Sequence, residues 1–368
     1  MRNPRPAHQP WQPPHCPNPN CKYHNDSHIP WPYRKHGFYR RLAPPHRIQR
    51  FLCLHCRRAF SRQTFSTTYW LKLPHLLREV FMRCVGCMAR RQIARDLQVA
   101  PSTIDRLIAR LGRHCLLFHT WMLDHAPPCR DLVIDGLESF EWSQYYPCHF
   151  HLAVDQASGL FLGFTDSELR RKGRMTGYQK QRRQELERRY GRPDPQAIGR
   201  DMRQLLGTVL PESGPVIVRS DDHPAYRRAL AGLGAEVEHR VTSGQARRDR
   251  RNELWEVNLL ELVIRHSSAQ HKRETIAYAK RRQSAALQLG VFLVWKNYLK
   301  NRYEKGCRVT AGMLSGLTAE RWWPEQVLAE RLFRTRITLP ARWGEYYDGL
   351  IRTRALGVNR RHDLKYAY

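Results

Sequence analysis

The sequence is poor in acidic residues and contains no long apolar run. Its 368 residues include 63 lysines and arginines against 33 aspartates and glutamates, so the formal net charge is +30. No stretch approaches the roughly 18–20 apolar residues that a membrane-spanning helix needs, and the first residues lack the apolar core of a signal peptide. The excess positive charge favours a polyanionic partner. We therefore expect a cytoplasmic protein that binds nucleic acid and no membrane.

Disulfide bonds are not expected either, although the chain has ten cysteines. Cysteines without a secretion signal indicate metal ligands and free thiols in a reducing compartment. Four of them form two short pairs, Cys16 with Cys21 and Cys53 with Cys56. Zn²⁺ prefers four tetrahedral ligands, and two cysteine turns at the ends of a small β-ribbon supply them. Because residues 1–70 have too little apolar periodicity for a core of their own, a structural Zn²⁺ must stabilise this ribbon.

The ligands of the ribbon leave one alternative open. The first cysteine pair is spaced more widely than usual, so a nearby histidine can replace one cysteine. The histidines close to the two pairs are His15, His24, His28 and His55. A further pair, Cys84 and Cys87, lies on the apolar face of a helical stretch, where buried packing is the better explanation.

Residues 71–126 are predicted to form an all-α helix-turn-helix domain. Residues 91–97 have the pattern of a first helix, residues 98–100 that of a turn, and a second helix begins at Pro101 and runs to Leu111. Apolar residues at helical spacing supply a small core for the two helices. The residues left to face a DNA major groove or its phosphates are Ser102, Thr103, Arg106 and Arg110.

Residues 131–305 have the alternating pattern of an α/β domain, and residues 306–368 are expected to be a helical C-terminal extension. The predicted strands are residues 131–135, 149–154, 160–165, 215–219 and 235–239. The predicted helices cover residues 195–209, 224–233, 253–267 and 274–301. Between them, residues 168–195 are charged and poor in apolar residues, which indicates an exposed basic insertion or helix.

Three acidic residues stand where this pattern can bring them together. Asp135 ends the first strand, Asp221 follows the strand at 215–219, and Glu261 shares a helix face with Asn258 and Arg265. Three carboxylates are the hard oxygen ligands that Mg²⁺ or Mn²⁺ requires. Two such ions about 4 Å apart activate an attacking oxygen and stabilise the leaving oxygen at a phosphodiester.

Neighbouring acidic residues are alternatives to this set. Asp222 adjoins Asp221, although the end of the strand favours Asp221. Glu253 and Glu256 share the helix of Glu261, and only the flanking Asn258 and Arg265 select the last of the three. Glu138 lies close to Asp135 but beyond the predicted strand, so a supporting or structural role is expected for it.

The chain resembles the insertion-sequence transposases of the DDE class over nearly all of residues 16–300. The similar residues are the four cysteines with Gly37, Arg41, Arg50, Phe60 and Ser61, then Asp135, then Ser220, Asp221, His223 and Tyr226, and finally Asn258, Glu261, Arg265 and residues 272–275. The resemblance implies a zinc ribbon, a helix-turn-helix and an RNase H-like catalytic domain. It also implies that Asp135, Asp221 and Glu261 bind the catalytic metal, with His223, Asn258 and Arg265 in support.

Such a protein is expected to act as a homodimer or higher oligomer on DNA, associated with the bacterial nucleoid. It would bind the terminal inverted repeats of a transposon, free a 3′-hydroxyl by metal-dependent cleavage, and join that hydroxyl to target DNA. Phosphate contacts are expected from residues 170–189 and 240–251, with Arg247, Arg248, Arg250 and Arg251 in the second segment. The alternatives are a non-catalytic DNA-binding regulator derived from a transposase, and a nuclease that cuts without joining.

Overall fold

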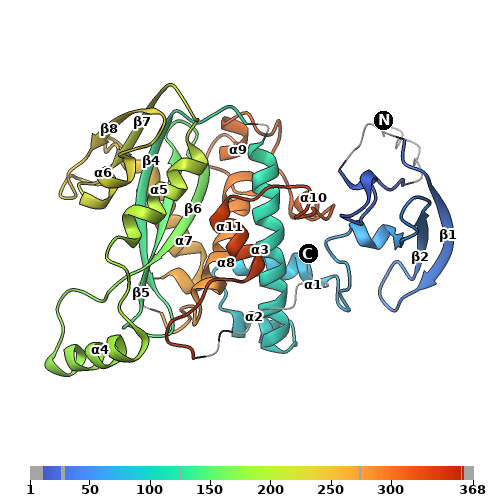
Figure 1. Cartoon of the computed structure of the whole chain (residues 1–368), viewed down its shortest axis with the longest axis horizontal. Coiled ribbons are helices and arrows are strands. Elements are labelled where there is room, and N and C mark those ends of the chain that lie inside the picture. The colour runs from blue at the N-terminus through green and yellow to red at the C-terminus, as the bar shows by residue number, and fades with distance from the viewer. Residues whose placement is uncertain (1–10, 26–29, 125, 273–274, 358, 360–368) are drawn as a thin grey trace.

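The computed structural model describes residues 11–25, 30–124, 126–272, 275–357 and 359. It consists of a small antiparallel ribbon and a larger α/β body, and the ribbon lies at one end of the body (Figure 1). His28, a possible zinc ligand, lies outside the described residues. None of the described helices is both long enough and apolar enough to cross a membrane.

The ribbon is a three-stranded sheet in the order β1-β2-β3. Its elements are η1 (Lys22–His24), β1 (Tyr33–Arg40), β2 (Arg47–Cys53), β3 (Ala59–Ser61) and η2 (Arg62–Phe65). Aromatic rings fill the small core between its strands, with Phe51 stacked on Phe60 at 5.6 Å between ring centroids. Phe333, from far along the chain, belongs to the same cluster.

Three helices follow the ribbon, α1 (Leu76–Val85), α2 (Arg90–Asp96) and α3 (Pro101–Leu123). Helix α2 and the beginning of α3 lie where the sequence predicts them, but α3 does not end near Leu111. It continues to Leu123 because its second half is buried against α8. At the crossing Gly112 is required, since a Cβ there would lie 2.4 Å from the carbonyl oxygen of Leu287.

The body contains a five-stranded mixed sheet in the order β6-β5-β4-β7-β8. Its strands are β4 (Asp131–Phe140), β5 (Pro147–Asp155), β6 (Phe161–Glu168), β7 (Pro215–Ser220) and β8 (Glu236–Val241). The pairs β4–β5 and β5–β6 are antiparallel, whereas β4–β7 and β7–β8 are parallel. The protein is therefore of the mixed α/β class, with a second, smaller sheet in the ribbon.

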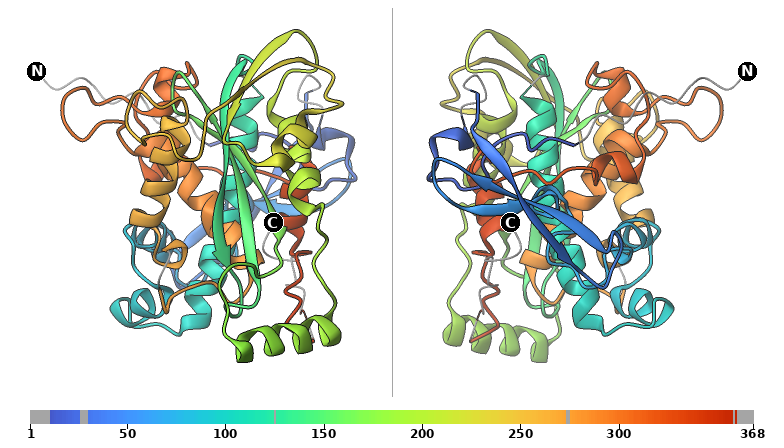
Figure 2. Two further views of the ribbon diagram at one scale, coloured as in Figure 1. Left: turned by 90° about the vertical axis from the view of Figure 1, so that its left-hand side faces the viewer. Right: turned by 90° about the vertical axis from the view of Figure 1, so that its right-hand side faces the viewer.

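Helices cover both faces of this sheet. They are α4 (Gly177–Tyr190), α5 (Ala197–Val209), α6 (Pro224–Leu230), α7 (Trp255–Ser267), η3 (Ala269–His271), α8 (Arg282–Val294) and the π-helical turn η4 (Trp295–Leu299). Apolar residues of α5 and α6 share one buried cluster with alternate residues of β4, and those of α3, α7 and α8 share the other. Helix α4 has no buried residue and projects from the body, as expected for the basic insertion (Figure 2).

Two predicted boundaries are wrong. Strand β4 does not end at Asp135 but continues to Phe140, because its antiparallel pairing with β5 extends to that residue. The helix predicted from residue 274 begins only at Arg282. There, the Arg282 amide donates to Glu141 Oε2 at 2.9 Å, and the buried Arg282 guanidinium pairs with Asp166 at 2.5 Å.

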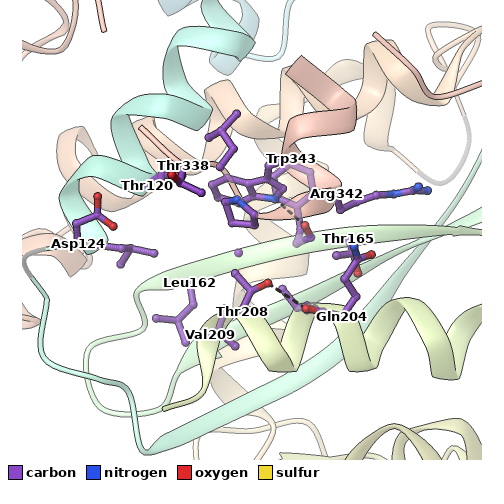
Figure 3. Close-up of a pocket in the computed structure, with 16 residues that line it drawn as sticks. Thr120, Asp124, Leu162, Thr165, Gln204, Thr208, Val209, Thr338, Arg342 and Trp343 are labelled. Atoms are coloured by element: carbon purple, nitrogen blue, oxygen red, sulfur yellow. Dashed lines mark hydrogen bonds between the residues drawn. The ribbon is translucent and has the colours of Figure 1, made fainter. Parts of the chain in front are cut away.

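The C-terminal extension packs onto this body. Its helices are α9 (Ala311–Leu314), α10 (Pro324–Val327) and α11 (Ala341–Asp348). Helix α11 is fastened to β6, since Arg342 pairs with Asp166 at 2.7 Å and the Trp343 indole donates to the Phe164 carbonyl at 2.8 Å. A pocket of about 340 Å³ lies between α11, α3, β6 and α5, with Trp343 and Leu162 on its wall (Figure 3).

The extension also contacts the ribbon. Residues 328–337 run along it, and the Arg331 amide donates to the Phe65 carbonyl at 2.9 Å. The Thr335 hydroxyl and His24 Nε2 lie 2.7 Å apart, within hydrogen-bond distance. Phe333 packs against the rings of His15 and Phe65, which also contact each other. The first and last parts of the chain thus form one interface.

Candidate functional site

The four ribbon cysteines form a compact cluster. Cys16 and Cys21 flank the turn before η1, Cys53 ends β2, and Cys56 lies in the turn towards β3. Their sulfur atoms all lie within 4.8 Å of one another, with 3.6 Å between Cys16 and Cys56 and 4.0 Å between Cys21 and Cys53. Four thiolates about 2.3 Å from one Zn²⁺ would lie about 3.8 Å apart. The cluster therefore has the ligand type and spacing that Zn²⁺ requires.

Among the described residues, the four cysteines form this cluster without a histidine. His15 and His24 are buried against Phe333, where each ring meets the phenyl ring edge-on. His55 lies beside the sulfurs, with its Nδ1 3.5 Å from Cys21 Sγ, which suits a neighbour of the ligands. Of the further pair, Cys84 is buried in the apolar core and packs as expected, whereas Cys87 is only half-buried.

The register of the sheet brings Asp135 and Asp221 to the same level. Val133 of β4 pairs with Arg219 of β7, so Asp221, two residues on, lies level with Asp135. Asp135 lies on the same face of β4 as Val133 and Leu137, whose side chains join the apolar cluster of α7. Its carboxylate therefore points to the sheet face that α7, the helix of Glu261, covers.

The hydroxyl of Tyr226 lies beside Asp135 and within the electrostatic influence of Asp221 and Glu261. It lies 3.5 Å from Asp135 Oδ1. Burial raises the pKa of Tyr226 well above its usual value, and the negative charges of Asp135, Asp221 and Glu261 each raise it further. The sequence contained Tyr226 within a motif but gave no reason to assign it a role. Only the fold shows that α6 aims its ring at the carboxylates.

The surroundings of Asp135 disfavour its charged form. Its pKa is raised to about 6, chiefly because the carboxyl is buried and also because the negative charge of Asp221 is near. The Gly136 amide, which donates to Asp135 Oδ1 at 2.7 Å, and the positive charge of Arg248 oppose this rise. A buried oxygen donor beside a second carboxylate fits a divalent cation such as Mg²⁺ or Mn²⁺.

The three carboxylates are nevertheless less tightly grouped than the cysteines. Among the described residues, only the cysteine cluster brings three or more such ligand atoms within 4.8 Å of one another. The carboxylates come from two strands and a helix, and Asp135, Asp221 and Glu261 are all half-buried.

The structure separates the alternative acidic residues from this group. Asp222 is exposed and faces the loop at Gly244. Glu256 is buried and pairs with Arg302 at 2.7 Å. Glu253 is largely exposed and lies 4.0 Å from Arg219, and Glu138 is also exposed.

The supporting residues take different positions. Arg265 donates to the His271 carbonyl at 3.1 Å and to the Glu138 carbonyl at 3.4 Å, so it ties the end of α7 to β4. His223 caps α6, where its Nδ1 accepts from the Ala225 amide at 3.2 Å. Asn258 is half-buried on α7.

His149 is a neighbour of this site that the sequence did not single out. Its ring occupies the space beside Gly136, where a Cβ would lie 1.9 Å from the imidazole. Gly136 therefore cannot be replaced without moving the ring, which lies next to the backbone of Asp135. The available signal was a glycine directly after the predicted strand, since a glycine next to a strand can mark a close approach.

Helices α2 and α3 present only part of the surface that the sequence predicts for a helix-turn-helix. Ser102 and Arg106 are exposed and Thr103 is half-buried at the beginning of α3. The prediction that Arg110 faces DNA is wrong. Its side chain is 8% exposed and donates to the carbonyls of Thr67 and Tyr69, at 3.0 and 2.7 Å. It holds the segment after the ribbon against α3 and does not face solvent.

The basic segment after β8 lies beside the carboxylates. Its four arginines, Arg247, Arg248, Arg250 and Arg251, are all exposed. Arg248 is near enough for its charge to lower the pKa of Asp135. A phosphate bound beside Asp135 would therefore be attracted by the positive charge of Arg248.

Comparison with known proteins adds little to this geometry. The sequence matches no known family and no curated protein. Among solved structures, the chain is similar to the simian T-cell lymphotropic virus intasome in complex with PP2A regulatory subunit B56 gamma, at 14% identity and a TM-score of 0.25. The match covers 52% of this chain and 55% of that one, so the chain spans about half of its length. A TM-score this low carries no argument about fold or function.

Proposed function

We propose that the protein is a DNA transposase of the DDE class, which cuts DNA at transposon ends and joins the freed 3′-hydroxyl to target DNA. The observation that carries the proposal is the position of Asp135 beside the Tyr226 hydroxyl, where the negative charges of Asp221 and Glu261 also act. The order β6-β5-β4-β7-β8, with three antiparallel strands followed by two parallel ones, supports an RNase H-like interpretation of the body.

In this proposal the chain's own residues hold the site in position. Asp135 and Asp221 approach from neighbouring strands and Glu261 from the helix that covers them. Arg265 anchors α7 to β4, and Arg248 attracts the phosphate. Bound Mg²⁺ or Mn²⁺ ions would supply the activated oxygen and neutralise charge on the phosphate.

The remaining parts are proposed to recognise and organise DNA. We assign residues 1–70 to a zinc ribbon, 71–126 to a helix-turn-helix, 131–305 to the catalytic domain and 306–368 to an extension. Ser102, Thr103 and Arg106 would read the end sequence, and Arg247, Arg250 and Arg251 would hold phosphates. Two or more copies would assemble on the transposon ends.

The decisive experiment is a strand-transfer assay with the DNA that flanks the gene. Purified protein with Mg²⁺ or Mn²⁺ should cut at inverted repeats there and join the ends to a plasmid. Asp221→Asn should abolish both steps, whereas Asp222→Asn, its exposed neighbour, should not. Binding of the repeats without cutting would instead identify a DNA-binding regulator, and cutting without joining would identify a nuclease.

A further inference from the structure

A basic groove separates α2 and the beginning of α3 from the segment between η3 and α8. It has a volume of about 1100 Å³. Its positively charged lining consists of Arg90, Arg91, Arg95, Lys272, Lys280 and Arg281, and Asp105 is the acidic residue of this lining. The proposed function has so far given these six cations no role.

The cations of the groove are of two kinds. Arg90 is part of the wall, since it donates to Asp105 Oδ1 at 2.9 Å and to the Ser284 carbonyl at 3.0 Å. The other five are exposed or half-exposed. Within the described part of the chain, none of these five forms an ion pair within 4.0 Å. The groove therefore carries positive charge that the protein itself leaves largely unneutralised.

This groove connects two regions that the proposed function assigns to DNA. One wall includes Arg91, Arg95 and Pro101, and Pro101 is the residue directly before Ser102 of the proposed reading helix. The other wall continues from α7, whose Arg265 donates to the His271 carbonyl. In Figure 2 the cyan α2 region and the orange segment after α7 lie at the same end of the body. The groove thus lies between the beginning of α3 and the segment that follows the helix of Glu261.

The second wall also presents apolar and aromatic groups among its cations. Ile276 is 100% exposed. The Lys280 ammonium lies 3.8 Å from the centre of the Tyr278 ring, and the Tyr278 hydroxyl donates to the Trp142 carbonyl at 2.9 Å. A wholly exposed isoleucine beside cations suits a ligand with both phosphates and apolar faces, such as the bases of a nucleic acid.

We propose that this groove binds the sugar–phosphate backbone of the DNA that runs from the base pairs read by α3 to the phosphodiester at the carboxylates. The inference rests on the proposed function and adds a second DNA-binding surface to it. Binding there is independent of sequence, because lysine and arginine contacts to phosphates carry no base information. Ile276 contacts the bases of the same DNA.

The test measures the affinity for a fluorescently labelled duplex of random sequence over a range of salt concentrations. Two groove variants are compared with wild type, Arg91→Ala with Arg95→Ala, and Lys280→Ala with Arg281→Ala. A matched control removes the same charge elsewhere, as Lys305→Ala with Arg308→Ala in the exposed loop before α9. Each lost phosphate contact lowers the slope of log affinity against log salt by about 0.9. We expect each groove pair to lower the slope by about 2 and the control to leave it unchanged.

Each outcome decides between the groove and simpler explanations. Equal losses in groove and control variants would show only a general effect of charge and would overturn the inference. Unchanged binding in the groove variants, with wild type still binding, would overturn it while leaving the proposed function intact. If wild type binds no duplex, the proposed function itself fails. Ile276→Ala should weaken duplex binding but not binding of polyglutamate, and equal loss for both would indicate an acidic peptide as the partner.

Discussion

The two clusters of metal-binding residue types in this chain are built in different ways. The four ribbon cysteines come from short turns and lie within 4.8 Å of one another. The three carboxylates come from β4, the end of β7 and α7. Their charges all act on Tyr226, but their oxygen atoms do not all lie within 4.8 Å of one another. The cysteine cluster is almost wholly buried, whereas the three acidic residues of the body are half-exposed.

This difference indicates what a bound metal would do in the cysteine cluster and at the carboxylates. The ribbon has a small aromatic core, so a bound Zn²⁺ contributes directly to its folding. The body has extensive apolar clusters on both faces of its sheet and can fold without a metal. A buried, closed site therefore stabilises structure, and an open carboxylate site leaves room for a substrate. The predictions below test this division.

Zinc removal should have the largest effect, and only on the ribbon. Structural Zn²⁺ contributes on the order of 10 kcal/mol in small zinc domains. Cys53→Ser should lower the zinc content from one atom per chain to none and disorder residues 11–70. Hydrogen exchange should then show fast exchange in β1 and β2 but continued protection in β4 and β5. Loss of protection in both regions would show that the ribbon and the body fold as one unit.

Removal of a carboxylate should have the opposite effect, on activity and not on folding. Glu261→Gln keeps the size of the side chain and removes its charge, so DNA cutting should fall by at least about a thousandfold, or about 4 kcal/mol in the activation barrier. The thermal unfolding midpoint should change little. Glu253→Gln on the same helix is the matched control and should cut DNA normally. Normal cutting by Glu261→Gln would remove this residue from the site.

The parts of this division that the sequence predicts are those with local causes. The zinc cysteines, α2 and the beginning of α3 depend on short-range patterns and lie where they were expected. The continuation of α3 beyond Leu111 depends on α8, which lies far away in the sequence. The burial of Arg110 likewise depends on the segment at Thr67 and Tyr69. A local sequence pattern cannot predict such long-range contacts. The position of the Tyr226 hydroxyl beside Asp135 depends on a long-range contact as well.

Acid should destabilise the body through its buried histidines. Burial lowers the pKa of His119 to about 4, and its Nδ1 lies 2.8 Å from the Tyr298 hydroxyl. The unfolded chain therefore binds a proton between pH 6.5 and 4 that the folded chain does not. Stability falls as the pH falls through this window, by up to about 3 kcal/mol for this one residue.

Urea unfolding at several pH values tests this linkage. His119→Gln should flatten the fall in the free energy of unfolding between pH 7 and 5. The matched control is His266→Gln, because His266 is exposed on α7. The same steep fall in His119→Gln as in wild type would show that this histidine does not drive the acid response.

The smallest expected effect separates two arginines of α3 that the sequence treats alike. Arg106 is exposed, whereas Arg110 is buried and bound to the carbonyls of Thr67 and Tyr69. Arg106→Ala should weaken binding to the proper end sequence by about 1–3 kcal/mol and affect a random duplex less, because a base contact is lost. Arg110→Ala should leave that preference unchanged and lower the thermal unfolding midpoint, since two buried carbonyls lose their donor.

Binding curves on both duplexes, measured at one salt concentration, distinguish these effects. Equal loss on the two duplexes for Arg106→Ala would reduce its role to a phosphate contact. A loss of sequence preference in Arg110→Ala, with unfolding unchanged, would mean that its buried position is not kept when DNA binds. In that case the link between the ribbon and the body would open on DNA, and the two regions would behave in the complex as the separate units that their different cores suggest.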